Sequence, residues 1–208
     1  MVLTVLLQAA EAEVASLNLL EMALKGGWIM IPLLLLGIIA VYIFIERLLV
    51  IRKASYKDTT FMNKIKDYIN EGKIDAALTL CKNTDTPYSR MIEKGITRLG
   101  RPMNDVMVAI ENVGNLEIAK LEKGLSLLAT TAGGGPMIGF LGTVIGMIEA
   151  FFNMSNAGNN VDVSLLAGGI YTAMVTTVAG LIVGVIAFFA YNYLISLVDK
   201  VVHDMEAR

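Results

Sequence analysis

Four of the threonines inside two long uncharged segments of this 208-residue chain could do chemistry: Thr143 in residues 124–148, and Thr172, Thr176 and Thr177 in residues 163–198. A threonine hydroxyl in an apolar helix can bond to a carbonyl one turn back, and that local role stays open for each of them. The alternative is that several hydroxyls line a polar crevice that relays protons or replaces part of a cation's hydration shell. Neither segment has an acid or base in its middle, so a titrating carboxylate on such a path must come from another chain.

Small residues recur beside these hydroxyls at helical spacing. Four glycines of residues 124–148, at positions 135, 139, 142 and 146, are spaced four, three and four apart, which places them within an arc of about 60° on a helix. A second small-residue face lies in residues 163–198. Membrane helices associate through such faces, because small residues let two backbones approach closely. The residues predicted to pack the two helices together are Gly135, Gly139, Gly142, Gly146, Ala173, Gly180 and Gly184.

Three uncharged runs are long enough to cross a membrane: residues 28–45, 124–148 and 163–198. A bilayer core of roughly 30 Å needs about 20 apolar helical residues. The third run is too long for a single crossing and has no strong turn signal, so we expect one helix that projects beyond the membrane. The apolar residues before the first run recur at helical spacing, which favours an amphipathic helix at the membrane surface.

The basic residues predict how the chain is oriented. Fourteen of the 17 Lys and Arg residues lie between Glu46 and Lys123. By the positive-inside rule the middle loop and the C-terminus are cytoplasmic, and the N-terminus and the loop that starts at Glu149 lie outside.

The cytoplasmic loop contains its own helix signals. Residues 59–70, 73–82 and 87–99 are predicted helices, with Gly72, Pro87 and Gly100 at their ends. After Pro102, Asn104 can cap a long helix that enters the membrane unbroken. The apolar stripe of that helix is predicted to contain Val106, Ile110, Val113, Leu116, Ile118, Leu121 and Leu125.

The predicted fold is therefore all-α, an integral membrane protein with three transmembrane helices, two of them extended into the cytoplasm, and a small cytoplasmic helical subdomain. The expected parts are a periplasmic amphipathic N-terminal helix (1–27), a first transmembrane helix (28–50), the cytoplasmic subdomain (51–101), a long helix containing the second span (102–152), a periplasmic loop (153–162) and the third span with its cytoplasmic extension (163–208).

Composition excludes several classes of protein. The chain is 55% hydrophobic and 17% charged, with a mean hydropathy of +0.63 and a net charge of −2. These values disfavour an ordinary soluble enzyme and a nucleic-acid binder, and the expected partners are membrane lipids and other protein chains. One cysteine and one histidine provide neither a disulfide framework nor a typical zinc site, so we expect no metal and no cofactor. Cys81 lies on an apolar helix face and is expected to be buried.

Two glycine-rich segments carry a family resemblance: GPMIGFLGTVIGMI at 135–148 and GIYTAMVTTVAGL at 169–181. They resemble the second-span and third-span motifs of the ExbB/TolQ/MotA family. Glu46-Arg47-Leu48 after the first span, and a loop pattern from Glu71-Gly72 through Cys81 to Pro87, are similar to ExbB-type chains. MotA has four spans, so the three-span count favours ExbB or TolQ.

The resemblance implies a subunit of a cation-driven motor in the bacterial inner membrane. ExbB-like proteins form a pentamer around a dimer of a single-span partner, ExbD, whose aspartate carries the proton. The motor acts through TonB on outer-membrane transport. By position, the resemblance assigns Thr143 and Thr177 to the ion pathway, with Thr172 and Thr176 beside them.

One position departs from the family pattern, because many ExbB chains have a glutamate where this chain has Thr172. The extra hydroxyls suit a hard cation, so sodium coupling is an alternative to proton coupling. A TolQ-like subunit of the Tol-Pal system and a passive oligomeric membrane scaffold also remain open.

Overall fold

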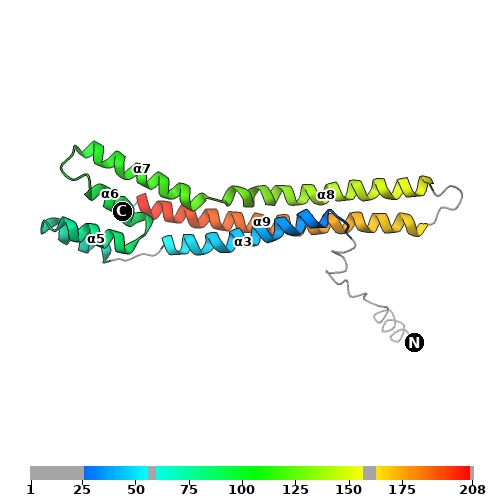
Figure 1. Ribbon diagram of the computed structural model, residues 1–208, viewed down its shortest axis with the longest axis horizontal. Coiled ribbons are helices and arrows are strands. Elements are labelled where there is room, and N and C mark those ends of the chain that lie inside the picture. The colour runs from blue at the N-terminus through cyan, green and yellow to red at the C-terminus, as the bar shows by residue number, and fades with distance from the viewer. Residues whose placement is uncertain (1–25, 56–59, 157–162, 207–208) are drawn as a thin grey trace, which may run out of the picture. The chain divides into compact units, whose positions relative to one another are not determined.

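The computed structural model describes residues 26–55, 60–156 and 163–206, and it is all-helical over these ranges (Figure 1). This confirms the predicted all-α fold class. The predicted N-terminal helix, and residues 157–162 of the predicted periplasmic loop, lie outside the described residues. The helices are α3 (Met30–Ala54), α4 (Phe61–Asn70), α5 (Ile74–Thr84), α6 (Pro87–Ile96), α7 (Met103–Glu122), α8 (Leu125–Asn156) and α9 (Val163–Glu206).

Three stretches are long and apolar enough to cross a membrane, as the sequence predicts. They are α3, the stretch Met103–Asn156 that contains α7 and α8, and Leu166–Glu206 within α9. The helix α9 is continuous for 44 residues, so the third uncharged run lies in one helix without a turn, as expected. The helix α8 continues past Glu149 to Asn156, and the loop after it therefore starts later than predicted.

The expectation of an unbroken helix from the cytoplasmic loop into the second span is wrong. The helix α7 ends at Glu122, and α8 begins at Leu125. Between them Gly124 has a φ of +85°, a backbone conformation that glycine adopts without the steric cost of a side chain. The N-cap of α7 is Pro102, and Asn104 lies inside the first turn instead of capping it.

A side chain of α3 supports this break. The Arg47 guanidinium donates a hydrogen bond of 3.2 Å to the backbone oxygen of Lys120, in the last turn of α7. It also donates to Glu46 at 2.6 Å. The last carbonyls of a helix have no partner within the helix, so Arg47 supplies one and places a positive charge at the negative end of the helix dipole.

The chain divides into two compact units, which are described separately. The first contains the described residues 26–39, 130–156 and 163–188, and its central contact is the α8–α9 pair considered below. Leu33 of α3 is buried in this unit. A Cβ built on Gly37 would lie 3.5 Å from Val183, so α3 contacts α9 at that point.

The second unit contains the described residues 40–55, 60–129 and 189–206 and has a small core between α4, α5 and α6. Phe61, Ile65, Ala77, Cys81 and Ile96 are buried together there. The burial of Cys81 is as predicted, and it raises the pKa of the thiol to about 11, because an apolar environment disfavours the thiolate. The start of α6 is held by a capping box, in which Thr86 and Ser89 bond reciprocally.

The packing face of α7 differs from the predicted stripe at one turn. Leu116 is 62% exposed, whereas Glu117 is 4% exposed. The Glu117 carboxylate is ion-paired with Arg90 of α6 and, at 2.6 Å, with Lys120. The paired cations compensate the desolvation of the carboxylate, which allows a charged residue to occupy the buried side of α7.

Replacing Gly124 with alanine tests the break between α7 and α8. A Cβ at this position has room, since its nearest neighbour would be Ile43 Cγ2 at 3.7 Å, so the cost comes from the backbone conformation alone. We expect Gly124→Ala to lower the free energy of unfolding in detergent by about 1–2 kcal/mol, the cost of a left-handed conformation for a residue with a Cβ. Gly133→Ala, in the open interior of α8, is the matched control and should not destabilise the protein. Equal stability of the two variants would contradict this account.

Candidate functional site in the α8–α9 pair

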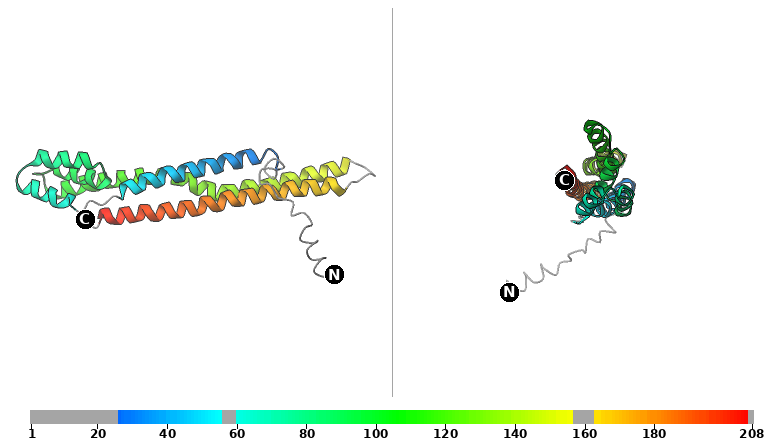
Figure 2. Two further views of the ribbon diagram at one scale, coloured as in Figure 1. Left: turned by 90° about the horizontal axis from the view of Figure 1, so that it is seen from below. Right: turned by 90° about the vertical axis from the view of Figure 1, so that its left-hand side faces the viewer.

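Helices α8 and α9 lie side by side in the first compact unit, as the two perpendicular views show (Figures 1 and 2). We call it the membrane-spanning unit, because its helices belong to the three stretches that are long and apolar enough to cross a membrane. The contacts between them run in antiparallel register. Gly135 faces Gly184, Gly139 faces Gly180, and Gly146 faces Ala173. These pairs recur about every one to two turns, so small residues line the contact along most of its length.

The two backbones are so close that side chains would not fit between them. A Cβ built on Gly180 would lie 2.6 Å from the backbone oxygen of Gly135, and one built on Gly139 would lie 2.8 Å from the backbone oxygen of Thr176. At Gly184 a Cβ would lie 2.6 Å from the ring of Pro136. Glycine is therefore required sterically at these positions.

All seven residues predicted to pack the helices lie along this contact. The structure adds one pair at its end, Ala150 against Gly169, where a Cβ on the glycine would collide with the alanine side chain. Ala150 was not among the predicted packing residues. The signal was present in the sequence, because Ala150 follows Gly146 by four residues and continues the same face.

Two of the four predicted threonines converge on one backbone carbonyl. The hydroxyl of Thr177 donates to the Gly139 oxygen at 3.2 Å. The hydroxyl of Thr176 lies 3.4 Å from the same oxygen and donates at 2.7 Å to Ala173 in its own helix. Thr176 is 1% exposed, whereas Thr177 is partly exposed. The close approach of the glycines is what brings the Gly139 carbonyl within reach of α9.

The other two threonines are placed differently. The hydroxyl of Thr143 donates at 2.6 Å to Phe140 in its own helix, so the local role left open for threonine applies here. Thr143 and Thr172 are both partly exposed. Three of the predicted hydroxyl residues are thus accessible at the surface of this unit, and Thr176 is enclosed between the helices.

This arrangement provides oxygen atoms without ionisable groups. Residues 125–148 of α8 and 163–198 of α9 contain no Asp, Glu, Lys or Arg. Within the described part of the chain no cluster of His, Cys, Asp or Glu could hold a metal ion. Hydroxyls and carbonyls can solvate a cation or pass a proton along a hydrogen-bonded chain, but they cannot hold a proton as a carboxylate does.

The steric requirement for glycine can be tested on α9. Gly180→Ala places a methyl group against the Gly135 backbone, so we expect it to destabilise the helix pair by about 1–3 kcal/mol, as over-packing of a tight contact does. Gly168→Ala is the matched control in the same helix, because no atom lies within 4 Å of its added Cβ. The measurement is the unfolding of the purified chain in detergent, followed by circular dichroism. Similar losses in both variants would show that the contact does not require glycine.

Comparison with known proteins gives one family for this chain. Residues 83–207, which include α6 to α9, match the model of the MotA/TolQ/ExbB proton channel family. The match covers more than half of the chain and contains all the threonines and glycines of the α8–α9 contact.

Individual relatives extend the similarity to the first span. The chain is 29% identical over 190 residues to an ExbB homolog of Methanothermobacter thermautotrophicus, covering 91% of this chain and 67% of the relative. It is 30% identical over 183 residues to the protein ExbB-like 1 of Synechocystis, covering 86% and 72%. It is 27% identical over 205 residues to the Tol-Pal system protein TolQ of Haemophilus influenzae, covering 91% and 90%.

Proposed function

The chain belongs to the MotA/TolQ/ExbB proton channel family, and from this premise we propose that it is the ExbB-type subunit of an inner-membrane motor driven by the proton motive force. In this proposal the chain forms a homo-oligomer, expected to be a pentamer, around an ExbD-like single-span dimer. A TonB-like protein transmits the motion to outer-membrane transport. The family is one of channel and motor proteins and not a known enzyme family.

The observation that carries the proposal is the pair of hydroxyls on the Gly139 carbonyl. Thr177 is partly exposed while it donates to this oxygen, so its own lone pairs can accept a hydrogen bond from a group outside the pair. A carboxylic acid on a neighbouring helix is such a group, because its protonated form is a donor. Thr143 and Thr172 are accessible and can extend the polar path, while Thr176 holds α9 against α8.

The lack of charge in these segments supports a division of roles between chains. This chain supplies hydroxyl and carbonyl oxygens, and the partner supplies the carboxylate that gains and loses the proton. Thr172, in place of the glutamate of many ExbB chains, leaves the partner's acid as the ionisable group of the pathway. The excess of Lys and Arg between Glu46 and Lys123 favours a cytoplasmic middle segment and C-terminus.

A TolQ-type subunit is the second candidate, because the Haemophilus influenzae TolQ relative aligns over nearly the full length of both chains. The genes beside this one distinguish the two systems by encoding either an ExbD-like and TonB-like pair or components of the Tol-Pal system.

Replacing Thr177 with valine distinguishes the proposed motor subunit from a passive membrane scaffold that has no ion path. Valine keeps the shape and removes the hydroxyl, so we expect ion flux through the chain and its single-span partner, co-reconstituted in liposomes, to fall about tenfold. Thr177→Ser keeps the hydroxyl and should retain most of the flux. Size-exclusion chromatography should show that both variants assemble as the wild type does. Full flux in the valine variant would favour the scaffold.

The coupling ion has its own test. We expect flux measured with a pH-sensitive dye at a fixed membrane potential to persist when all sodium is replaced by potassium, because the family description is that of a proton channel. A protonophore should abolish the pH gradient that drives motion. Loss of flux on removing sodium would instead assign the accessible hydroxyls to a sodium pathway.

A further inference from the structure

The exposed side of α7 carries apolar side chains that neither the proposed ion path nor the core of the second unit uses. Met103 is 74% exposed, and Met107 and Leu116 are each 62% exposed. Lipid is a poor cover for them, because residues 117–123 contain four charged side chains and separate this part of α7 from the uncharged run that begins at Gly124. Apolar side chains gathered on a surface in water mark a contact with another protein chain.

A pocket of about 400 Å³ lies on one edge of this exposed side, between α6 and α7. Val108, Asn112 and Leu116 line it from α7. Lys94, in the last turn of α6, and Arg98, in the turn that follows, line it from the other side. We call it the α6–α7 pocket. It combines apolar side chains with positive charge.

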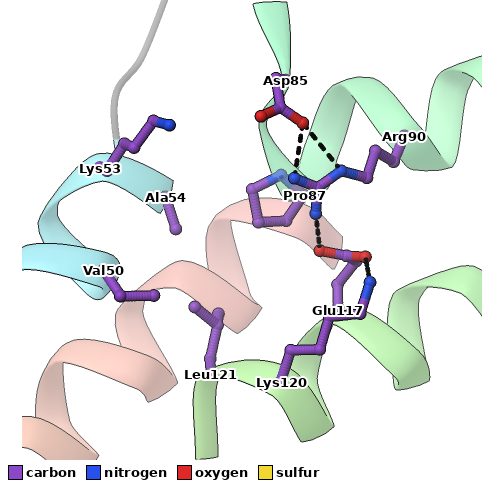
Figure 3. A pocket seen from close by; sticks show the side chains of 9 residues that line it. All are labelled: Val50, Lys53, Ala54, Asp85, Pro87, Arg90, Glu117, Lys120 and Leu121. Carbon is purple, nitrogen blue, oxygen red and sulfur yellow. Dashed lines mark hydrogen bonds and ion pairs between the residues drawn. The ribbon is translucent and has the colours of Figure 1, made fainter. Parts of the chain in front are cut away.

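The two cations of the α6–α7 pocket are held in place by a third. Lys94 and Arg98 follow Arg90 at intervals of four residues, so they continue one side of α6. The Arg90 guanidinium is bonded to Asp85 and paired with Glu117 of α7, and this pairing holds α6 against α7 (Figure 3). Among the residues that the structure describes, Lys94 and Arg98 form no ion pair. Their charge is therefore available to a partner.

The charge of the pocket defines what that partner carries. Asp105 also lines the pocket, so two cations and one carboxylate leave a net charge of +1. A complementary surface has apolar side chains that fill the pocket and one carboxylate that pairs with the cations.

A surface of this chemistry lies on the opposite edge of α7. Met103, Met107 and Glu111 recur at intervals of four residues, which places them within an arc of about 80° on the helix. The centre of this arc lies about 140° around the helix from the residues of α7 that line the pocket. Glu111 is exposed and forms no ion pair with any described residue. We call these three residues the methionine ridge.

We propose that the methionine ridge of one copy of this chain packs into the α6–α7 pocket of a neighbouring copy, with Glu111 of the ridge paired to Lys94 and Arg98 of the pocket. The inference rests on the homo-oligomer of the proposed function and identifies two surfaces that join its subunits. Methionine and arginine are enriched at interfaces between proteins, and the flexible methionine side chain adapts to an irregular pocket.

A closed ring requires contacts of this kind. Each member of a ring presents one surface to the neighbour on one side and a different surface to the neighbour on the other side. The ridge and the pocket lie on opposite edges of α7, so they cannot meet within one chain, but each can meet a neighbour. Copies related by rotation about the membrane normal have equivalent residues at the same height. Both surfaces lie within residues 103–116, about 20 Å of helix, so they can meet at one height.

The test is cross-linking of two differently tagged full-length chains that are co-expressed in membranes. One chain carries Met107→Cys in the ridge, and the other carries Asn112→Cys in the pocket. We expect a short thiol-reactive cross-linker to give a mixed dimer, and neither variant expressed alone to cross-link more than the wild type. Thr79→Cys, on the exposed side of α5 and outside both surfaces, replaces Met107→Cys as the matched control. The native Cys81 is buried and adds the same low background to every sample.

Charge reversal tests the ion pair in the same assay. Glu111→Arg and Arg98→Glu each place like charges at the contact, and we expect each to lower the yield of mixed dimer about fivefold, the effect expected from a strong exposed ion pair. Both changes in every chain restore opposite charges and should recover most of the yield. Glu122→Arg makes the same reversal on α7 outside both surfaces and should leave the yield unchanged. Circular dichroism checks that all variants retain their helices.

Several results would overturn the proposal. Strong cross-linking of Met107→Cys expressed alone would show that two ridges meet about a two-fold axis. Absence of the mixed dimer, in chains that size-exclusion chromatography still shows as oligomers, would assign the pocket to a different protein and leave the proposed function in place. A double variant without recovery would exclude the pairing of Glu111 with the pocket. A wild-type chain that elutes as a single copy would overturn the proposed function together with this inference.

Discussion

The backbone contact between α8 and α9 is the constraint on which the membrane-spanning unit depends. Inside a bilayer, apolar side chains gain little by leaving lipid for protein, so helix pairing relies on close packing and on hydrogen bonds between helices. Glycine at Gly139 and Gly180 permits both, because it lets the backbones touch and brings a carbonyl within reach of Thr177. The polar character of the site is therefore a consequence of its packing.

Much of this architecture could be predicted from the sequence, because its causes are local. The spans are runs without charge that are long enough for a bilayer. The short helices of the second unit begin and end near Gly72, Pro87 and Gly100, whose backbone preferences act within one turn. The small-residue faces follow from spacing alone, since residues three or four apart share one side of a helix.

Other features could not be predicted, because they depend on residues distant in the chain. The break at Gly124 lies between two helix-favouring segments, and Arg47, 73 residues before Lys120, supports it. The burial of Glu117 requires Arg90 from another helix. Likewise, spacing shows that Thr177 lies near a small-residue face, but only the register of α8 against α9 identifies the carbonyl that it reaches.

The burial of Cys81 has a practical consequence for studying motion in this molecule. It is the only cysteine in the chain, and its pKa of about 11 means that about one thiol in ten thousand is ionised at pH 7. Maleimide reagents react with the thiolate, so a cysteine introduced at an exposed position would be labelled far faster than Cys81. Spin labels or fluorophores can therefore be placed on α8 or α9 with the native cysteine left in its core.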